Sequence, residues 1–420
     1  MSEKNQIMTR EDAIRLSKEK AGMFPLIEVH VLHTVAGSLL NRDFNNRQKL
    51  LHYGGTLRAR FSSASVLHNI RFGMETELNV HTKYLPSLIK RVLINESNEE
   101  NDLLETEWKL VDQLFTSDKK DKKDKSKNDE TSDDIKEVFK TEQIIDVDQF
   151  TVNKYVEKIT SFAKQVADGS VKLQDAAKEI NKSMTTSSKD SPLSDVTALF
   201  GRMSADQTQS TVYSPLMVSH AFSIDPYAND YDDFTAVDDF LLKAGIVVTD
   251  EDGCGINSGA AHLGSIDVSA NTYYRYCAIC QTGLFENLCV GKPFDAVDEL
   301  IEKTYKLTAY FVKQFIVALP SAKQTRNFAR TAPDAVYIDK GSCMQGISAA
   351  NMFEKPVTAT SDRSVCDIGV DLLKEFMDKS VHGCFVDRTL TGQYWMSDKY
   401  NTPDGVSSIC YQDIDQIVRA

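Results

Sequence analysis

The amino-acid sequence predicts an α+β fold in which helices pack on a mainly antiparallel sheet, and three observations support this class. Two segments rich in β-forming residues, 26–33 and 261–280, indicate long core strands. Between them lies a mostly helical insertion, in which apolar residues recur at spacings of three and four. The elements run in the order strand, strand–helix, helical insertion, strand, long projection, strand, helix, strand, helix, which is an α+β pattern.

The elements follow in this order. Residues 9–20 form a short amphipathic helix, with Thr9 as N-cap and Asp12 three positions later. A strand at 26–33 leads into a polar loop over 36–55, a second strand at 56–61, and a helix from Ser62 or Ser63 through Arg71. The remaining elements are helices at 81–115, 147–166 and 171–184, strands at 194–203, 261–280 and 334–339, and helices at 294–319 and 369–380.

This order fits a ferredoxin-like, RRM-like core with insertions. The core takes residues 26–75, 192–203 and 259–420, and residues 1–25 precede it as an extension. Residues 76–191 form the helical insertion. Within it, 117–134 contains no apolar residue and is predicted to be a disordered loop. Residues 204–258 show no clear period and are predicted to project as a long hairpin.

Charge is distributed unevenly along the 420 residues. The net charge of −13 argues against a protein that binds nucleic acid over its whole surface. Segment 41–71 nevertheless has a local charge of +5, because one acid, Asp43, is outnumbered by six basic residues, Arg42, Arg47, Lys49, Arg58, Arg60 and Arg71. An acidic protein with one basic segment can bind a polyanion there and avoid it elsewhere.

The basic segment has the chemistry of a phosphate site. A turn at Gly54-Gly55 allows backbone N–H groups to approach a phosphate. Arg58 and Arg60 alternate along a strand, so both project from one face. Ser62 and Ser63 place hydroxyls at a helix N-terminus, which favours anions. The residues alone fit two interpretations equally well. One is a phosphate site, and the other is a set of surface arginines paired to acids.

Other chemistries are not favoured. Cys277 and Cys280 lie three apart on a predicted strand and have no second ligand pair, so both are expected to be structural. The histidines His30, His33, His52 and His68 are likewise expected to be structural. No phosphate-binding loop, zinc-protease or serine-hydrolase motif occurs. We therefore expect no catalytic site, no metal and no cofactor. The N-terminus has no apolar leader and no run reaches 18 apolar residues, so we expect a cytoplasmic protein without a membrane span.

Six stretches carry a family resemblance. They are LNRDFNNRQKLLHYGGTLRARFSSASVLHNIR (40–71), ALFGRM (198–203), DDFTAVDD (232–239), GAAHLGSIDVSANTYYRYCAI (259–279), LPSAKQTRNFA (319–329) and ANMFEKPV (350–357). Together they resemble, in order, the backbone subunit of the type I-E CRISPR surveillance complex, the CasC family of Cascade. The resemblance covers roughly residues 26–360.

The resemblance implies a palm with an RRM-like sheet, fingers made by the helical insertion, and a thumb made by the hairpin. Such subunits polymerise along a CRISPR RNA, and the thumb presses between nucleotides at regular intervals. The implied partners are CRISPR RNA, the target DNA strand, further copies of the chain and other Cascade subunits, without a membrane. The residues expected to bind RNA are Asn41, Arg42, Lys49, Arg58, Arg60, Ser62, Arg71, Met203, Phe234, Thr235, Val237, Lys323 and Gln324.

The sequence also departs from the family, and alternatives remain. Ala64 and Leu67 replace two polar RNA contacts, and Asp233 replaces an aromatic residue before Phe234. Related RNA-targeting subunits cleave with an aspartate after the first strand, and Asp43 lies in a comparable loop. A guide-directed, metal-dependent ribonuclease is therefore one alternative. A stand-alone RNA-binding protein outside any CRISPR system is the other.

Overall fold

The computed structural model of the chain describes residues 6–74, 79–96, 103–115, 145–186, 191–203, 211–236, 243, 248–249, 255–256, 262–320, 324–342, 346–382 and 389–419. The chain divides into two compact units. The first contains Met1–Phe24, Met74–Leu216 and Cys280–Leu307, and the second contains Pro25–Gly73, Met217–Ile279 and Thr308–Ala420.

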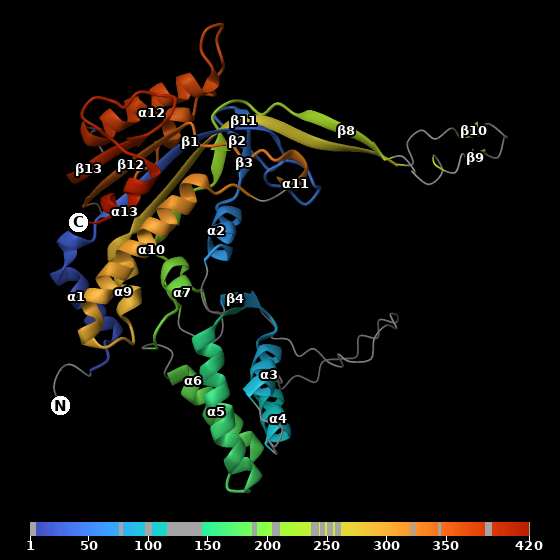
Figure 1. Cartoon of the computed structure of the whole chain (residues 1–420), viewed down its shortest axis with the longest axis vertical. Helices are drawn as coiled ribbons and strands as arrows, with labels where there is room; N and C mark the ends of the chain where they lie inside the picture. The colour runs from blue at the N-terminus through green and yellow to red at the C-terminus, as the bar shows by residue number, and fades with distance from the viewer. Residues whose placement is uncertain are drawn as a thin grey trace. The chain divides into compact units, whose positions relative to one another are not determined.

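The second unit is built on a large sheet, whose strands run in the order β14-β13-β12-β1-β11-β7-β3-β2, with β6 and β8 also paired to β11 (Figure 1). The strands are β1 (Leu26–Ser38), β2 (Leu50–Tyr53), β3 (Thr56–Phe61), β6 (Leu216–Val218), β7 (Ala221–Ser223), β8 (Asp230–Ala236), β11 (His262–Cys280), β12 (Ala335–Ser342), β13 (Thr389–Met396) and β14 (Ser407–Ser408). β1 pairs antiparallel with β12, and β3 with β7, whereas β13 and β14 run parallel. The predicted α+β class with an antiparallel-rich sheet is confirmed.

Strand β1 lies at the centre of this sheet because its first eight residues are buried without interruption. Its two histidines are hydrogen-bonded in the core. His30 Nδ1 lies 2.9 Å from the Tyr274 hydroxyl, and His33 Nε2 lies 2.8 Å from the Thr331 carbonyl oxygen. Helix α12 (Val365–His382) packs against β1 (Figure 1). The prediction of structural histidines is confirmed for these two, whereas His52 and His68 are exposed.

A two-stranded ribbon extends from the sheet, with its first strand inside the predicted hairpin 204–258 and its second strand after it. In it β8 pairs with the first part of β11, from Asp230 opposite Val268 to Ala236 opposite His262 (Figure 1). A second short pair joins β9 (Val248–Thr249) and β10 (Gly255–Ile256). The predicted start of the hairpin at residue 204 is wrong, because β6 and β7 belong to the main sheet. These strands have three residues each, too few to show a period.

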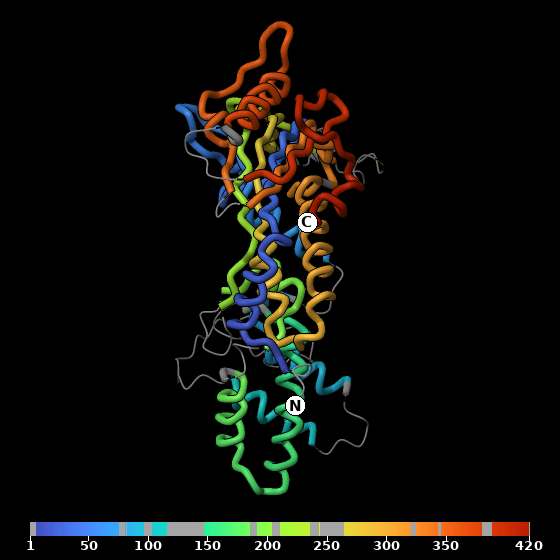
Figure 2. Tube along the Cα trace, turned by 90° about the vertical axis from the view of Figure 1, so that its left-hand side faces the viewer, coloured from blue at the N-terminus to red at the C-terminus, as the bar shows by residue number. Residues whose placement is uncertain are grey.

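The first unit contains the helical insertion. Its helices are α3 (Leu85–Glu96), α4 (Leu104–Phe115), α5 (Gln149–Ala167) and α6 (Leu173–Thr186), and β4 (Asn79–Thr82) pairs with β5 (Ile145–Asp148). Figure 2 shows α5 and α6 side by side. The apolar faces of α3, α4, α5 and α6 share one core, which includes Ile89, Leu110, Ile159 and Ile180. The predicted disordered loop 117–134 lies outside the described residues.

The N-terminal segment also folds within the first unit. Helix α1 (Arg10–Glu19) packs against α9 (Gln281–Cys289). The Thr9 side chain accepts a hydrogen bond from the Asp12 backbone N–H, and the Asp12 carboxylate accepts one from the Thr9 backbone N–H. This reciprocal capping box is the one that the sequence predicts.

The predicted strand at 194–203 is wrong, because these residues form helix α7 (Asp195–Phe200). Ser194 caps the helix by accepting a hydrogen bond from the Thr197 backbone N–H at 3.1 Å. Gly201 ends it with a φ of +74°. A short apolar run does not distinguish a buried strand from a buried helix, so the two end residues decide.

The other described elements are η2 (Ala21–Met23), α2 (Ser63–Phe72), η3 (Phe294–Ala296), α10 (Val297–Val317), α11 (Gln324–Asn327), η4 (Ala349–Phe353), η5 (Tyr411–Asp413) and α13 (Ile414–Ile417). None of the helices in the described part of the chain is long and apolar enough to cross a membrane.

Candidate nucleic-acid interface

The Gly54-Gly55 turn joins β2 to β3 in the second unit. Both residues have positive φ, +60° and +78°, which suits a tight hairpin turn. A β-carbon on Gly54 would lie 1.6 Å from the Glu354 carbonyl oxygen. Gly54 therefore permits a close approach between two stretches of this chain, which corrects the prediction that the pair admits a phosphate.

Arg58 is fully buried, with 0% of its surface exposed. Its guanidinium donates hydrogen bonds of 2.6–3.2 Å to the Thr56 hydroxyl and to the backbone carbonyls of Ser223, Ile224, Phe353 and Glu354. Burial lowers the pKa of Arg58, and the nearby Asp225 carboxylate opposes that shift. Arg58 thus holds three segments of the unit together. The prediction that it contacts RNA is corrected, because its donors are already engaged inside the protein.

Arg60, two residues further along β3, is half-buried. Its Nε donates to the Leu50 carbonyl at 3.1 Å, which orients the rest of the guanidinium. The Arg60 backbone N–H donates to the Lys49 carbonyl at 2.9 Å, so the two basic residues are held next to each other. The Gln48 side-chain amide donates to both the Lys49 and Arg60 carbonyls and fixes this arrangement.

The N-terminus of α2 faces the same place. Ser62 caps the helix, accepting a hydrogen bond from the Ser65 backbone N–H at 3.3 Å. The Ser62 backbone N–H donates to the Asn41 side-chain oxygen at 3.2 Å, and the Lys49 backbone N–H donates to the Asn41 carbonyl at 2.9 Å. The structure thus brings together Asn41, Lys49, Arg60 and Ser62, named here the basic cluster.

His220 joins the basic cluster, although the sequence did not predict it there. Its Nδ1 accepts a hydrogen bond from the Ser63 backbone N–H at 3.0 Å. The pKa of His220 is lowered by burial and then by the charges of Arg60 and Lys49. The charges of Arg60 and Lys49 beside His220 make the local potential positive, which is the condition that attracts phosphate. A lone histidine in a polar segment gives no signal of this role.

The loop before β2 carries two more predicted residues. Arg42 is exposed and donates to the Asn46 side-chain oxygen at 3.2 Å. The Asp43 carboxylate accepts hydrogen bonds from the backbone N–H groups of Asn45 and Arg47, at 2.8 and 2.9 Å. The Asp43 carboxylate therefore shapes its own loop.

The structure separates Arg71 from the basic cluster. Arg71 lies in the last turn of α2, eight residues after Ser63, or about 12 Å along the helix axis. At that position its charge is favourable for the helix dipole. Arg71 and the basic cluster are therefore too far apart to contact the same phosphate. The two ends of α2 can still contact different phosphates of one nucleic-acid strand.

The ribbon carries Phe234 opposite Gly264. A β-carbon on Gly264 would lie 2.4 Å from the Phe234 ring, so the ring covers this glycine. Arg326, on α11, lies over the same ring at 4.4 Å and forms a 2.9 Å ion pair with Asp232. Thr235 is exposed. Val237 and Lys323 lie outside the described residues, and Gln324 is the first residue of α11.

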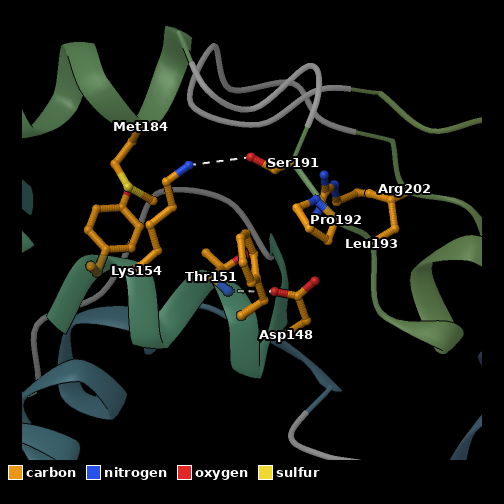
Figure 3. Close-up of a pocket in the computed structure, with 10 residues that line it drawn as sticks. Asp148, Thr151, Lys154, Met184, Ser191, Pro192, Leu193 and Arg202 are labelled. Atoms are coloured by element: carbon orange, nitrogen blue, oxygen red, sulfur yellow. Dashed lines mark hydrogen bonds between the residues drawn. The ribbon is translucent and has the colours of Figure 1, made fainter. Parts of the chain in front are cut away.

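Met203 belongs to the first unit and is 94% exposed. It follows Arg202, which forms an isolated bridge with Val212. A pocket beside it contains Asp148, Lys154 and Arg202, with Lys154 donating to the Ser191 hydroxyl (Figure 3). Its volume of about 30 Å³ holds little more than a water molecule, so it is not a candidate ligand site.

Two other sequence predictions concern metals and thiols. Cys277 is buried, and burial raises the pKa of its thiol well above the usual range. Cys280 is half-buried, and both cysteines are free thiols. Within the described ranges, no three His, Cys, Asp or Glu side chains gather as a metal site would require.

Comparisons with known proteins agree with the resemblance drawn from the motifs. A family model described as CT1975-like protein matches residues 27–419. A chain of a solved "CRISPR RNA-guided surveillance complex, pre-nicking" has a TM-score of 0.69 and 22% identity, with 94% of this chain and 99% of that chain covered. A chain of a "CRISPR RNA-guided surveillance complex" has a TM-score of 0.62 and 19% identity, with the same coverage. A comparison with curated proteins found no match.

Proposed function

Since this chain belongs to the family of CT1975-like proteins, we propose that it is the CRISPR RNA-binding backbone subunit of a DNA-targeting surveillance complex in antiviral defence. We assign it to type I-E, with an RRM-like palm in the second unit. The observation that carries the proposal is the basic cluster. Lys49, Arg60 and the N-terminus of α2 meet at one place on a chain whose net charge is −13.

The basic cluster has the properties of a phosphate site. The Arg60 guanidinium is oriented by its hydrogen bond to the Leu50 carbonyl, so it loses little ordering entropy when a phosphate arrives. The N-terminal end of a helix adds a partial positive charge and backbone donors. These groups contact the sugar–phosphate backbone and not base edges, so the protein binds any guide sequence. Pairing between guide and target then supplies sequence specificity.

Further parts of the chain extend this site along the strand. Phe234 and Thr235 on the ribbon press between nucleotides, and Met203 of the first unit contacts a displaced base. Copies of the chain repeat the arrangement along one RNA and contact the target DNA strand and other subunits of the complex. Support comes from the matching order of motifs and from the fold of the surveillance-complex chains.

We further propose that the subunit has no catalytic site of its own. Asp43, the residue on which a ribonuclease would depend, uses its carboxylate to hold the backbone of its loop. Target cleavage is then the task of another protein.

The salt dependence of RNA binding tests the basic cluster. Lys49→Ala combined with Arg60→Ala should weaken binding to single-stranded RNA of any sequence. The slope of log affinity against log salt should fall by about 1.4, at about 0.7 for each phosphate that the variant no longer neutralises. Lys178→Ala, an exposed lysine of the first unit, is the matched control and should leave the slope unchanged. An unchanged slope in the folded double variant would remove the cluster from the RNA site.

A further inference from the structure

A cavity of about 570 Å³ opens in the second unit beside the C-terminal half of α2. Its walls come from α2, from the end of α10, and from the segment after α11. His68 and Phe72 line one side, Val317 lies at the end of α10, and Phe328 and Arg330 line another. The volume lies within the range of about 300–1,000 Å³ that is usual for ligand pockets.

The aromatic side chains of this cavity are open to solvent. Phe72 is 83% exposed and Phe328 is 74% exposed. The His68 and Phe72 rings stack, with centroids 5.8 Å apart and planes at 13°. Exposed aromatic rings grouped around one cavity are typical of a binding surface, because single exposed apolar residues do not gather in this way.

Phe328 also has an unusual backbone conformation, with a φ of +38°. A bulky residue in this region is strained, and such strain persists only where the surroundings impose it. The neighbours of Phe328 supply that constraint. Asn327 donates to the Gly37 carbonyl at 3.3 Å, and the Thr331 hydroxyl donates to the Thr34 carbonyl at 2.7 Å. The hydrogen bonds of Asn327 and Thr331 therefore fix the backbone on both sides of Phe328, and its ring stays exposed.

The opposite wall is equally fixed. The Asn69 side-chain amide donates to the Leu319 carbonyl at 2.8 Å and joins α2 to the end of α10. The Tyr310 hydroxyl donates to the Ile70 carbonyl at 3.1 Å. The cavity is thus formed in advance between anchored elements, which lowers the entropy that a ligand must offset.

The charge of the lining indicates the kind of ligand. Although the chain has a net charge of −13, no aspartate or glutamate is among the described lining residues, and Arg330 and His68 are present. Planar apolar faces beside a guanidinium match a nucleobase and its phosphate, since bases stack on aromatic rings and phosphates pair with arginine. Helix α2 also connects the cavity with the basic cluster at its other end.

We propose that this cavity binds an unstacked nucleobase of a single strand, with the base against Phe72 and Phe328 and a flanking phosphate near Arg330. The proposal rests on the proposed function, because the same strand would follow α2 from the basic cluster. The base can come from the guide RNA or from the target DNA, which offer the same chemistry to the cavity.

Photocrosslinking tests the proposal with the full chain. Single-stranded RNA and DNA of one sequence, each carrying 5-iodouracil, are bound and irradiated, and the crosslinked peptides are identified by mass spectrometry. A third arm uses labelled DNA paired to unlabelled guide RNA. Crosslinks at Phe72 or Phe328 are expected, and the arm that gives them identifies the source of the base.

Variants complete the test. Phe72→Ala with Phe328→Ala should abolish these crosslinks and weaken strand binding at least about fivefold, the loss of one stacked base. The salt slope should stay at the wild-type value, because Lys49, Arg60 and Arg330, which neutralise the phosphates, are all unchanged in this variant. Tyr213→Ala, another exposed aromatic, is the control and should change nothing. Unchanged thermal unfolding of the variants shows that both fold.

Three results would overturn the proposal. If the double variant binds with wild-type affinity and the wild-type protein gives no crosslinks at Phe72 or Phe328, the cavity does not bind a base. The proposed function would be unaffected by that result. If the double variant changes the self-association of the RNA-free chain but not its binding to the strand, the cavity is a contact between copies of the chain. No binding of wild-type protein to either strand would dismiss both proposals.

Discussion

The guanidinium carbon of Arg326 lies 4.4 Å from the centre of the Phe234 ring. Arg326 also forms a 2.9 Å ion pair with Asp232, which precedes Phe234 on the same strand by two residues. The Phe234 ring is therefore held by a residue of α11 as well as by its cover over Gly264. This relationship links the loop after α10 to the ribbon and places a cation beside the aromatic residue that we assign to RNA.

A double-mutant cycle tests this pair. Phe234→Ala should cost much less than the roughly 3–5 kcal/mol of a buried core aromatic, because the ring is only half-buried. Combined with Arg326→Ala, it should show a coupling of about 0.5–1 kcal/mol in urea denaturation, as for an exposed cation–π contact. Tyr231→Ala on the same strand should show no coupling to Arg326. Unfolding of the chain by Phe234→Ala would place this ring in the core and remove it from the RNA site.

Arg58 and Arg60 should behave differently although they lie two residues apart. Arg58→Ala removes a hydrogen-bond donor from four backbone carbonyls, of which Ile224 keeps the Val357 backbone N–H, so the free energy of unfolding should fall by about 3 kcal/mol or more. Arg60→Ala should cost about 1 kcal/mol or less and should mainly weaken RNA binding. Equilibrium denaturation and RNA binding are measured for both. A stable Arg58→Ala protein that no longer binds RNA would contradict the structural role of Arg58.

His33 should make stability depend on pH. Burial and the neighbouring Arg275 lower the pKa of His33 to about 3. The folded state thus holds a neutral imidazole while the unfolded state takes up a proton below about pH 6.5. The contribution is complete above pH 6.5 and is lost as the pH falls towards 3, at about 1.4 kcal/mol per pH unit. Denaturation at pH 7.5, 5.5 and 4.5 should show a shallower dependence for His33→Gln. An identical pH dependence in the variant would show that His33 titrates normally in the folded protein.

Asp43 should affect RNA binding without affecting chemistry. Asp43→Ala removes the acceptor for two backbone N–H groups in the loop that carries Arg42, so RNA affinity should fall a few-fold, by about 1 kcal/mol. Asp43→Asn retains an acceptor oxygen and should be milder. The assembled complex is also incubated with labelled RNA complementary to the guide, plus magnesium or manganese. Periodic cuts in that RNA, abolished by both variants, would establish the ribonuclease alternative.

The sequence predicted those elements whose pattern is long enough to be distinctive. The strand β11, the helix α5 and the helix α10 agree with their predicted ranges to within a few residues. Errors came from short segments, since α7 has six residues and β6 and β7 have three each. In such short segments the structure is decided by the capping residues and by pairing with strands that are distant in the sequence.

The candidate site was predicted only in part, because it too depends on contacts between residues that are far apart in the sequence. Strand periodicity correctly placed Arg58 and Arg60 two residues apart on β3. It did not reveal the carbonyls that bury Arg58, because these come from segments about 165 and 295 residues further along the chain. His220 reaches Ser63 from 157 residues away, and that contact exists only in the folded unit. Local pattern therefore predicted the basic segment, whereas tertiary packing decides which of its arginines stays accessible at the surface.

Co-purification with RNA shows directly whether this chain binds a guide RNA. The chain is expressed with a CRISPR array and its companion subunits, purified, and the bound RNA is sequenced. We expect RNA of uniform length that contains single spacers from the array, with recovery strongly reduced for Lys49→Ala combined with Arg60→Ala and unchanged for Lys178→Ala. Absence of array RNA, or cellular RNA of mixed length bound equally by both variants, would contradict a guide-RNA backbone function.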